Sequence, residues 1–178
     1  MRKIFIVLII LSLCSLASAQ GFKLGIAGNA TFPLGDFKDY AKSPGYGIDA
    51  FGVFDLMVLT VTARVGYLDF GEKDWMQDNV KLGTAKYKAV VGMAGLRWEF
   101  GLPVLPSFYA GLEGGIHAFT REYTMGAAEV PNPDESETKF SISPNVGVSF
   151  AGFDVSAYYM YIKDMSYWGV RLGWGIGI

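Results

Sequence analysis

The closing stretch of the chain, WGVRLGWGIGI, alternates between two kinds of residue. Trp168, Leu172 and Trp174 share one parity with other large apolar residues, whereas glycines and Arg171 occupy the other. Successive side chains of a β-strand point to opposite faces, so this period of two predicts a strand with one bulky apolar face and one narrow face. A chain that repeats this pattern must place its two faces in different environments.

The same alternation recurs along the chain in segments separated by turn-forming residues, and it predicts eight strands. No apolar run after Gln20 approaches the roughly 20 residues that a membrane-spanning helix needs. Pro144 cannot donate a hydrogen bond to a ladder, so it predicts a bulge or a local break in the sixth strand. We expect strands over residues 22–32, 45–54, 59–69, 86–100, 108–118, 140–150, 153–161 and 168–178.

The connections between these segments alternate between long and short, apart from a short last one. Tight turns at one rim and long loops at the other are typical of a membrane β-barrel. The pattern therefore predicts an all-β fold, an eight-stranded antiparallel up-and-down transmembrane β-barrel. Two segments are expected to be loops. Glu72 to Asp78, which contains Trp75, is expected to form a contact surface. Gly126 to Thr138, which contains four acidic residues, is expected to be a mobile acidic loop or, alternatively, a calcium or partner-binding loop.

The composition helps to decide which face lies inside. The 178 residues are 51% hydrophobic and 18% charged, with 23 glycines and a net charge of −2. A soluble barrel would cover its outside with lysine, glutamate and threonine, but the less apolar parity here is mostly glycine, serine and asparagine. Small residues are what the lumen of an eight-stranded barrel accommodates, so we expect the apolar parity to face lipid. A soluble exported barrel or sandwich is the alternative.

Isolated charges on the narrow parity are expected to pair inside the lumen, because an unpaired buried charge is costly. With Lys23 near one rim, the basic and acidic groups balance. Aromatic residues of the apolar parity gather near strand ends, as in the two interfacial belts of membrane barrels. The predicted lumen polar network comprises Asp49, Arg64, Arg97, Glu99, Glu113, His117, Asp154 and Arg171.

The first residues read as an export signal. A basic start precedes the apolar run Ile4 to Leu13, and Ala17-Ser18-Ala19 is the pattern that signal peptidase accepts. We expect cleavage between Ala19 and Gln20, which gives a signal peptide over 1–19 and a barrel over 20–178. The alternatives are a membrane anchor, for which the run is short, and a lipoprotein acylated at Cys14, for which a small residue should precede the cysteine.

On GFKLGIAGNATFPLGDF, RVGYLDF and the closing glycine-aromatic strand, the sequence resembles the outer-membrane β-barrel domain family of small OmpA-like and OmpX-like, or porin-family, proteins. The resemblance implies a bacterial outer-membrane protein with both termini on the periplasmic side. The family's last strand usually ends in an aromatic residue, whereas this one ends in Ile178. No peptidoglycan-binding domain follows the eighth strand, so we expect no tether to the cell wall.

His117 is the sole histidine, and a few barrels of this family modify lipids. Glu113 is about 13 Å away along the same strand, and Phe119 stands where a deacylase of this fold has its serine. We therefore expect a hydrogen-bonding role for His117 and no catalytic residue. The sequence has no metal, phosphate or dinucleotide motif, so neither a cofactor nor a nucleic-acid partner is expected.

These observations favour a non-enzymatic outer-membrane protein, a monomer in contact with membrane lipid, with a structural role or a surface-contact role through its loops. An extracellular ligand or protein would bind at those loops. A narrow channel is the first alternative, and a lipid-modifying enzyme is the second.

Overall fold

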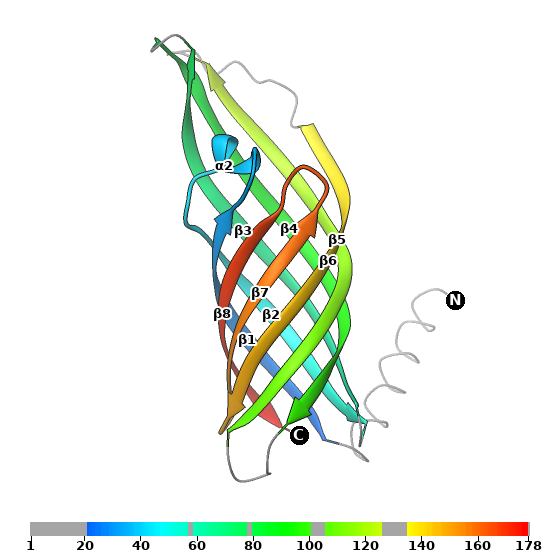
Figure 1. Ribbon diagram of the computed structural model, residues 1–178. Coiled ribbons are helices and arrows are strands. Elements are labelled where there is room, and N and C mark those ends of the chain that lie inside the picture. Colours follow the sequence, from blue (N-terminus) through cyan, green and yellow to red (C-terminus); the bar gives the residue numbers. More distant parts are fainter. Residues whose placement is uncertain (1–20, 57–58, 78–79, 101–105, 126–134, 178) are drawn as a thin grey trace, which may run out of the picture.

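The computed structural model describes residues 21–56, 59–77, 80–100, 106–125 and 135–177. These residues form one closed barrel of eight antiparallel strands and a short helix (Figure 1), so the predicted fold is confirmed. The segment predicted to be a signal peptide, with its predicted cleavage site between Ala19 and Gln20, lies outside the described residues, as does Ile178. The elements are β1 (Phe22–Pro33), α2 (Phe37–Tyr40), β2 (Gly45–Leu56), β3 (Leu59–Gln77), β4 (Val80–Phe100), β5 (Ser107–Met125), β6 (Glu135–Phe150), β7 (Phe153–Ile162) and β8 (Tyr167–Gly177).

Each strand pairs with its sequence neighbours, and pairing of β1 with β8 closes the barrel. Lys23 lies opposite Gly177, so β1 begins and β8 ends at the same rim, which we call the short-turn rim. Between β6 and β7 the chain turns there through Ala151 (φ 49°) and Gly152 (φ 88°). Two consecutive residues at positive φ are typical of a tight hairpin turn. The opposite end, which carries α2, is the loop rim (Figure 1).

A loop was predicted between residues 69 and 86. This prediction is wrong, because β3 and β4 continue there as a paired hairpin. Gly71 (φ 66°) lies at a register shift between Asp69 and Glu72, after which the ladder resumes. Beyond this point the outward residues whose side chains are described are polar, as in Lys86 opposite Glu72 and Thr84 opposite Asp74. This part of the strands therefore lacks the apolar alternation by which the others were identified. The β5–β6 connection is also shorter than expected, since β6 already begins at Glu135.

Pro144 produces a local break and no bulge. The β6–β7 ladder has no assigned pair at Ser143 or Pro144, yet Ile142 opposite Tyr161 and Asn145 opposite Tyr158 keep one register. On its other side Pro144 stays paired with Leu112 of β5. The proline therefore removes ladder contacts toward β7 without displacing the strand.

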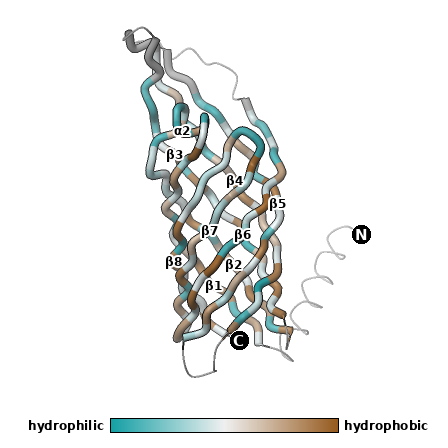
Figure 2. The backbone as a smooth tube through the Cα atoms, viewed as in Figure 1, coloured by the Kyte–Doolittle hydropathy of each residue, from teal (hydrophilic) through white to brown (hydrophobic). Residues whose placement is uncertain are grey.

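Burial alternates along the strands as the two parities predict. In β7, Asp154, Tyr158 and Met160 are buried in the lumen, whereas Val155 and Tyr159 are exposed on the outer wall. Figure 2 shows apolar segments distributed over the wall and polar ones gathered at the loop rim. Within the described residues, none of the helical structure is both long and apolar enough to cross a membrane.

Lumen glycines make room for the polar side chains. A Cβ at Gly66 would collide with the Asp49 carboxylate, and one at Gly115 would lie 2.7 Å from the Met93 sulfur. The narrow parity of small residues is therefore what allows longer side chains from neighbouring strands to cross a lumen of eight strands.

Candidate functional site

The lumen from the short-turn rim to its middle holds an ionic cluster of buried residues. We define it as Asp49, Arg64, Arg97, Glu113, Asp154 and Arg171. Three arginines face three carboxylates, so the formal charges of the cluster cancel. Six ionised groups can share a low-dielectric interior only if nearly every one finds a partner.

Arg64 joins two carboxylates that arrive from different strands. Its Nη1 donates to Asp49 Oδ2 at 3.1 Å, and its Nε donates to Glu113 Oε2 at 2.9 Å. The Thr62 hydroxyl adds a long contact to Glu113 Oε1 at 3.4 Å. Asp49 lies on β2, Arg64 on β3 and Glu113 on β5, so one guanidinium ties together three strands of the wall.

Asp154 is the second centre of the cluster. It accepts from Arg97 Nη1 at 3.1 Å, from Arg171 Nη2 at 3.3 Å and from the Tyr109 hydroxyl at 2.8 Å. The Tyr109 ring also lies 4.6 Å from the Arg97 guanidinium carbon. A carboxylate with two arginines and a phenol around it is fixed from three sides.

The structure brings six of the eight expected network residues into this cluster and places the other two elsewhere. Glu99 pairs with Arg97 but lies at the short-turn rim, where its side chain is 31% exposed. Arg171 finds its acid, Asp154, on the neighbouring strand β7. His117 lies nearer the loop rim, apart from the carboxylates.

His117 is fully buried and both of its ring nitrogens have partners. Nδ1 lies 3.0 Å from the Ser141 hydroxyl, and Nε2 lies 2.8 Å from the Tyr167 hydroxyl. Ser141 also contacts the Met93 sulfur at 3.2 Å. The serine next to the histidine comes from β6, so no sequence spacing within β5 could have revealed it.

A serine hydrogen-bonded to a histidine raises the question of a nucleophile. Catalysis would also require an orienting acid and access for a substrate. Here a tyrosine occupies the place of the acid, and Ser141 (3% exposed) and His117 (0%) are closed to solvent. The geometry is that of a satisfied internal polar group.

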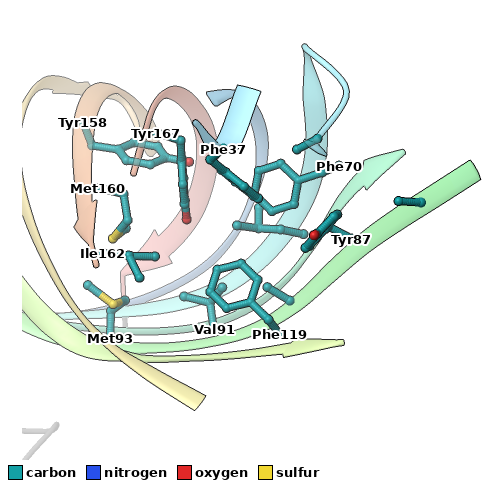
Figure 3. Packing of buried hydrophobic residues seen from close by; sticks show 14 residues of the cluster. Phe37, Phe70, Tyr87, Val91, Met93, Phe119, Tyr158, Met160, Ile162 and Tyr167 are labelled. Atoms are coloured by element: carbon teal, nitrogen blue, oxygen red, sulfur yellow. The ribbon is translucent and has the colours of Figure 1, made fainter. Parts of the chain in front are cut away.

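The lumen toward the loop rim is filled by an aromatic cluster (Figure 3). Phe37 of α2 points into the barrel and meets Phe70, Tyr87 and Phe119 edge to face, at centroid distances of 5.0, 5.7 and 6.3 Å. We define the cluster as Phe37, Ala41, Leu68, Phe70, Ala85, Tyr87, Ala89, Val91, Met93, Phe119, Tyr158, Met160, Ile162 and Tyr167.

No aromatic cluster was predicted from the sequence. The lumen parity was expected to be mostly glycine, serine and asparagine with isolated charges, although Leu68, Phe70 and Met160 continue that same parity past the ionic residues. The parity of these residues was a usable signal. Phe37 gave no such signal, because it lies in a connection between strands, next to Lys38 and Asp39, which are exposed.

The outer wall is apolar and ends in aromatic residues at both rims. Phe32 stacks on Trp168 at 4.2 Å near the loop rim, and Trp98 stacks on Phe100 at 6.2 Å near the short-turn rim. On β3–β5, charged side chains lie next to the apolar wall on its loop-rim side. Lys86 Nζ, for example, lies 3.4 Å from Asp69 Oδ2. An exposed apolar band between aromatic ends is typical of a lipid-facing surface.

Beyond the loop rim, four strands continue as a projecting sheet, which comprises β3 from Glu72, β4 to Lys86, β5 from Arg121 and β6 to Lys139 (Figure 1). The β2–β3 ladder ends at Tyr46 opposite Asp69, and the β6–β7 ladder ends at Ser141 opposite Ile162. Within the described residues, the outer edges of β3 and β6 therefore lack a strand partner beyond these points. Unpaired edges carry backbone donors and acceptors that another chain can use.

The expected loop sites lie partly outside the described residues. Residues 126–134 of the acidic connection are not described, and its remainder, from Glu135, belongs to β6. Trp75 lies in β3, opposite Gly83 of β4, and its side chain is outside the described part of the structure. In the part of the chain that is described, no three His, Cys, Asp or Glu side chains group as a metal site would need.

No protein-family model and no curated protein matches this sequence. Solved structures do match it over most of their length. Ail, the attachment invasion locus protein of Yersinia pestis, in complex with the heparin analogue sucrose octasulfate, is 17% identical, with a TM-score of 0.54, over 89% of this chain and 97% of Ail. Neisserial surface protein A is 14% identical, with a TM-score of 0.58, over 88% of this chain and 96% of its own.

Both of these proteins are eight-stranded outer-membrane barrels. At such low identity the likeness concerns the fold, and at that level the resemblance expected from the sequence is confirmed.

Proposed function

We propose that this chain is a bacterial outer-membrane barrel that acts without catalysis, by presenting its projecting sheet to an extracellular ligand or protein. The observation that carries this proposal is the continuation of β3–β6 beyond the loop rim with two unpaired edges. In this account residues 1–19 are a signal peptide, and the barrel of residues 20–178 stands in the membrane as a monomer with its short-turn rim in the periplasm.

The outer wall supports placement in a membrane. Leu24, Ile26 and Ile48 lie 49%, 62% and 59% exposed on it, and they belong to a surface of large apolar side chains that runs around the barrel. An apolar surface of this extent would be an aggregation hazard in water, whereas lipid tails solvate it. The polar side chains of the barrel segment lie in the lumen, as a bilayer requires.

The filled lumen favours the surface role over a channel. Buried ion pairs occupy one part of its length and packed aromatic rings the other, and Asp49, Asp154, Phe70 and Met160 are each no more than 1% exposed. A lipid-modifying enzyme is disfavoured by the burial of Ser141 and His117. The lumen network is, in this proposal, structural.

The charge at the loop rim distinguishes between a protein and a sulfated polysaccharide as the extracellular partner. Ail was solved with a heparin analogue, and a sulfated ligand would need a basic surface. Here Lys38, Lys42 and Lys73 at the loop rim are interspersed with Asp36 and Asp39. This mixed charge favours recognition by the unpaired strand edges, where an incoming protein segment adds a strand.

The test is to shorten the projecting hairpin and leave the barrel intact. Residues 74–84 are replaced by Asn-Gly, which joins the cross-strand partners Lys73 and Ala85 by a two-residue turn. Cells that display this variant should lose attachment to surfaces coated with serum proteins. A variant with Asn-Gly in place of Ala151-Gly152, at the opposite rim, is the control and should retain attachment. Undiminished attachment of the shortened variant, at equal surface levels, contradicts the proposal.

Orientation has its own test. Protease added to intact cells should cut between residues 126 and 134, and it should spare residues 101–105. The reverse pattern would place the short-turn rim outside. Amino-terminal sequencing of the purified protein should begin at Gln20.

A further inference from the structure

The connection between β1 and β2 is attached to the barrel chiefly through one large side chain. Phe37 is 2% exposed, whereas its neighbours Lys38, Asp39 and Tyr40 are exposed. Main-chain hydrogen bonds to the wall flank the segment, from Leu34 N to Ser166 O (2.9 Å) and from Lys42 N to Phe70 O (3.0 Å). Between them, the ammonium group of Lys73 donates to the carbonyl of Lys38.

The wall leaves space for this ring. Ala85 and Ala89 of β4 face the lumen at the level of the aromatic cluster, where larger wall residues would have filled the volume. The rings of Phe70, Tyr87 and Phe119 present their edges or faces to Phe37 at interplanar angles of 72° to 86°. The result is an aromatic cage with an occupant that comes from a loop.

The cage is closed from below and adjoins a cation at its mouth. Tyr167, hydrogen-bonded to His117, and then the ionic cluster fill the lumen toward the short-turn rim, so entry is from the loop rim. The guanidinium carbon of Arg121 lies 5.1 Å from the Tyr87 ring, which also contacts Phe37, and 5.9 Å from the Tyr40 ring of α2. If α2 swings out, Tyr40 leaves Arg121 together with Phe37.

We propose that the aromatic cage is a binding site for a small aromatic carboxylate from the external medium, with Phe37 as a displaceable internal occupant. The ring of the ligand takes the place of Phe37, and its carboxylate reaches Arg121. Gly35 (φ 56°) lies directly after the Leu34 anchor, so the segment has a residue at which it can turn. This inference does not rest on the proposed surface-contact function.

The size of the effect follows from competition between ligand and ring. When the binding-competent state is a minor one, at about 0.1–10% of molecules, the apparent affinity falls by that fraction. Removal of the internal occupant should therefore tighten binding by about tenfold or more.

The wild-type protein in nanodiscs, with ring-fluorinated phenylalanine at position 37, is titrated with 3-phenylpropionate. The fluorine resonance should shift saturably toward the position of an exposed ring, and empty nanodiscs correct for partitioning of the probe. An unchanged resonance at saturating probe overturns the proposal, whether or not any variant folds.

Binding to variants is then measured by equilibrium dialysis. Phe37→Ala should bind 3-phenylpropionate at least about tenfold more tightly than the wild type, and Phe140→Ala, an outward phenylalanine that is 86% exposed, should bind like the wild type. Equal affinities of wild type and Phe37→Ala overturn the displacement. The uncharged analogue 3-phenylpropanol should bind more weakly than the acid, and Arg121→Gln should remove that difference; equal affinity of acid and alcohol for the wild type overturns the role of Arg121.

Discussion

The two parts of the lumen are filled by different kinds of side chain. From the short-turn rim to the middle, the ionic cluster fills the space with charges that the strands themselves supply. Toward the loop rim, the aromatic cluster fills it with apolar rings, and its central ring, Phe37, comes from a connection. The first filling depends on pairing and the second on packing.

The two fillings differ in how much rearrangement they tolerate. Removal of one partner of a buried ion pair lowers the stability of the fold by several kcal/mol. The ionic cluster therefore has one acceptable arrangement. Rings pack without strict direction, and one of them is carried by a segment that main-chain hydrogen bonds fix at Leu34 and Lys42. The lumen next to the short-turn rim is therefore a fixed plug, and the lumen next to the loop rim holds the ring that we propose to be displaceable.

The largest expected effect is at Asp154. Asp154→Ala leaves Arg97 and Arg171 buried without their shared acid, and the free energy of unfolding should fall by about 3–5 kcal/mol. Urea unfolding in lipid vesicles, followed by tryptophan fluorescence, measures the change. Asp36→Ala is the control, because Asp36 is exposed and its side chain caps no helix, so it should change stability by less than about 0.5 kcal/mol. Equal stability of Asp154→Ala and Asp36→Ala would show that the ionic cluster contributes no more to stability than an exposed carboxylate does.

Phe37→Ala should come next. Deletion of a buried phenylalanine costs about 3–5 kcal/mol, and we expect the lower end of that range because the segment can move to reduce the cavity. The same unfolding experiment applies, with Tyr40→Ala as the matched control, since Tyr40 lies on the same helix and is 49% exposed. If Tyr40→Ala were the more damaging of the two, Phe37 would not be the residue that attaches α2.

His117→Ala should have a smaller effect on stability. It leaves the hydroxyls of Ser141 and Tyr167 buried without a shared partner, which costs about 1–3 kcal/mol. The lipid A mass spectrum of the host should not change, because the histidine is closed to lipid. A mass shift that depends on His117 would restore the enzyme hypothesis and give the loop-rim part of the lumen a chemical role.

Much of the fold could be predicted because the alternation of large apolar residues with small or polar ones marks each strand and its two faces. Trp168 to Ile176 show a lipid face and a lumen face directly, and the structure agrees with both. The continuation of β3 to Gln77 could not be read in this way, since a sheet surrounded by water needs no apolar parity. There the ladder itself, with Lys73 opposite Ala85, holds the strands together.

The interior could be predicted only in part. A lone charge among glycines, such as Arg171 or Asp49, points to the lumen, and the need for pairing follows from its burial. Which acid meets which arginine depends on stagger between strands, as the partnership of Arg171 with Asp154 illustrates. Phe37 needed three-dimensional information, because nothing in LGDFKDY shows that one of two aromatic residues turns inward.

A lumen that is filled along its whole length cannot conduct ions, which planar-bilayer recording measures. We expect the wild-type protein, once inserted, to show no steady conductance, because the ion pairs around Arg64 and Asp154 and the rings around Phe37 close the lumen in series. Stable, size-selective openings of the wild-type protein would contradict this expectation.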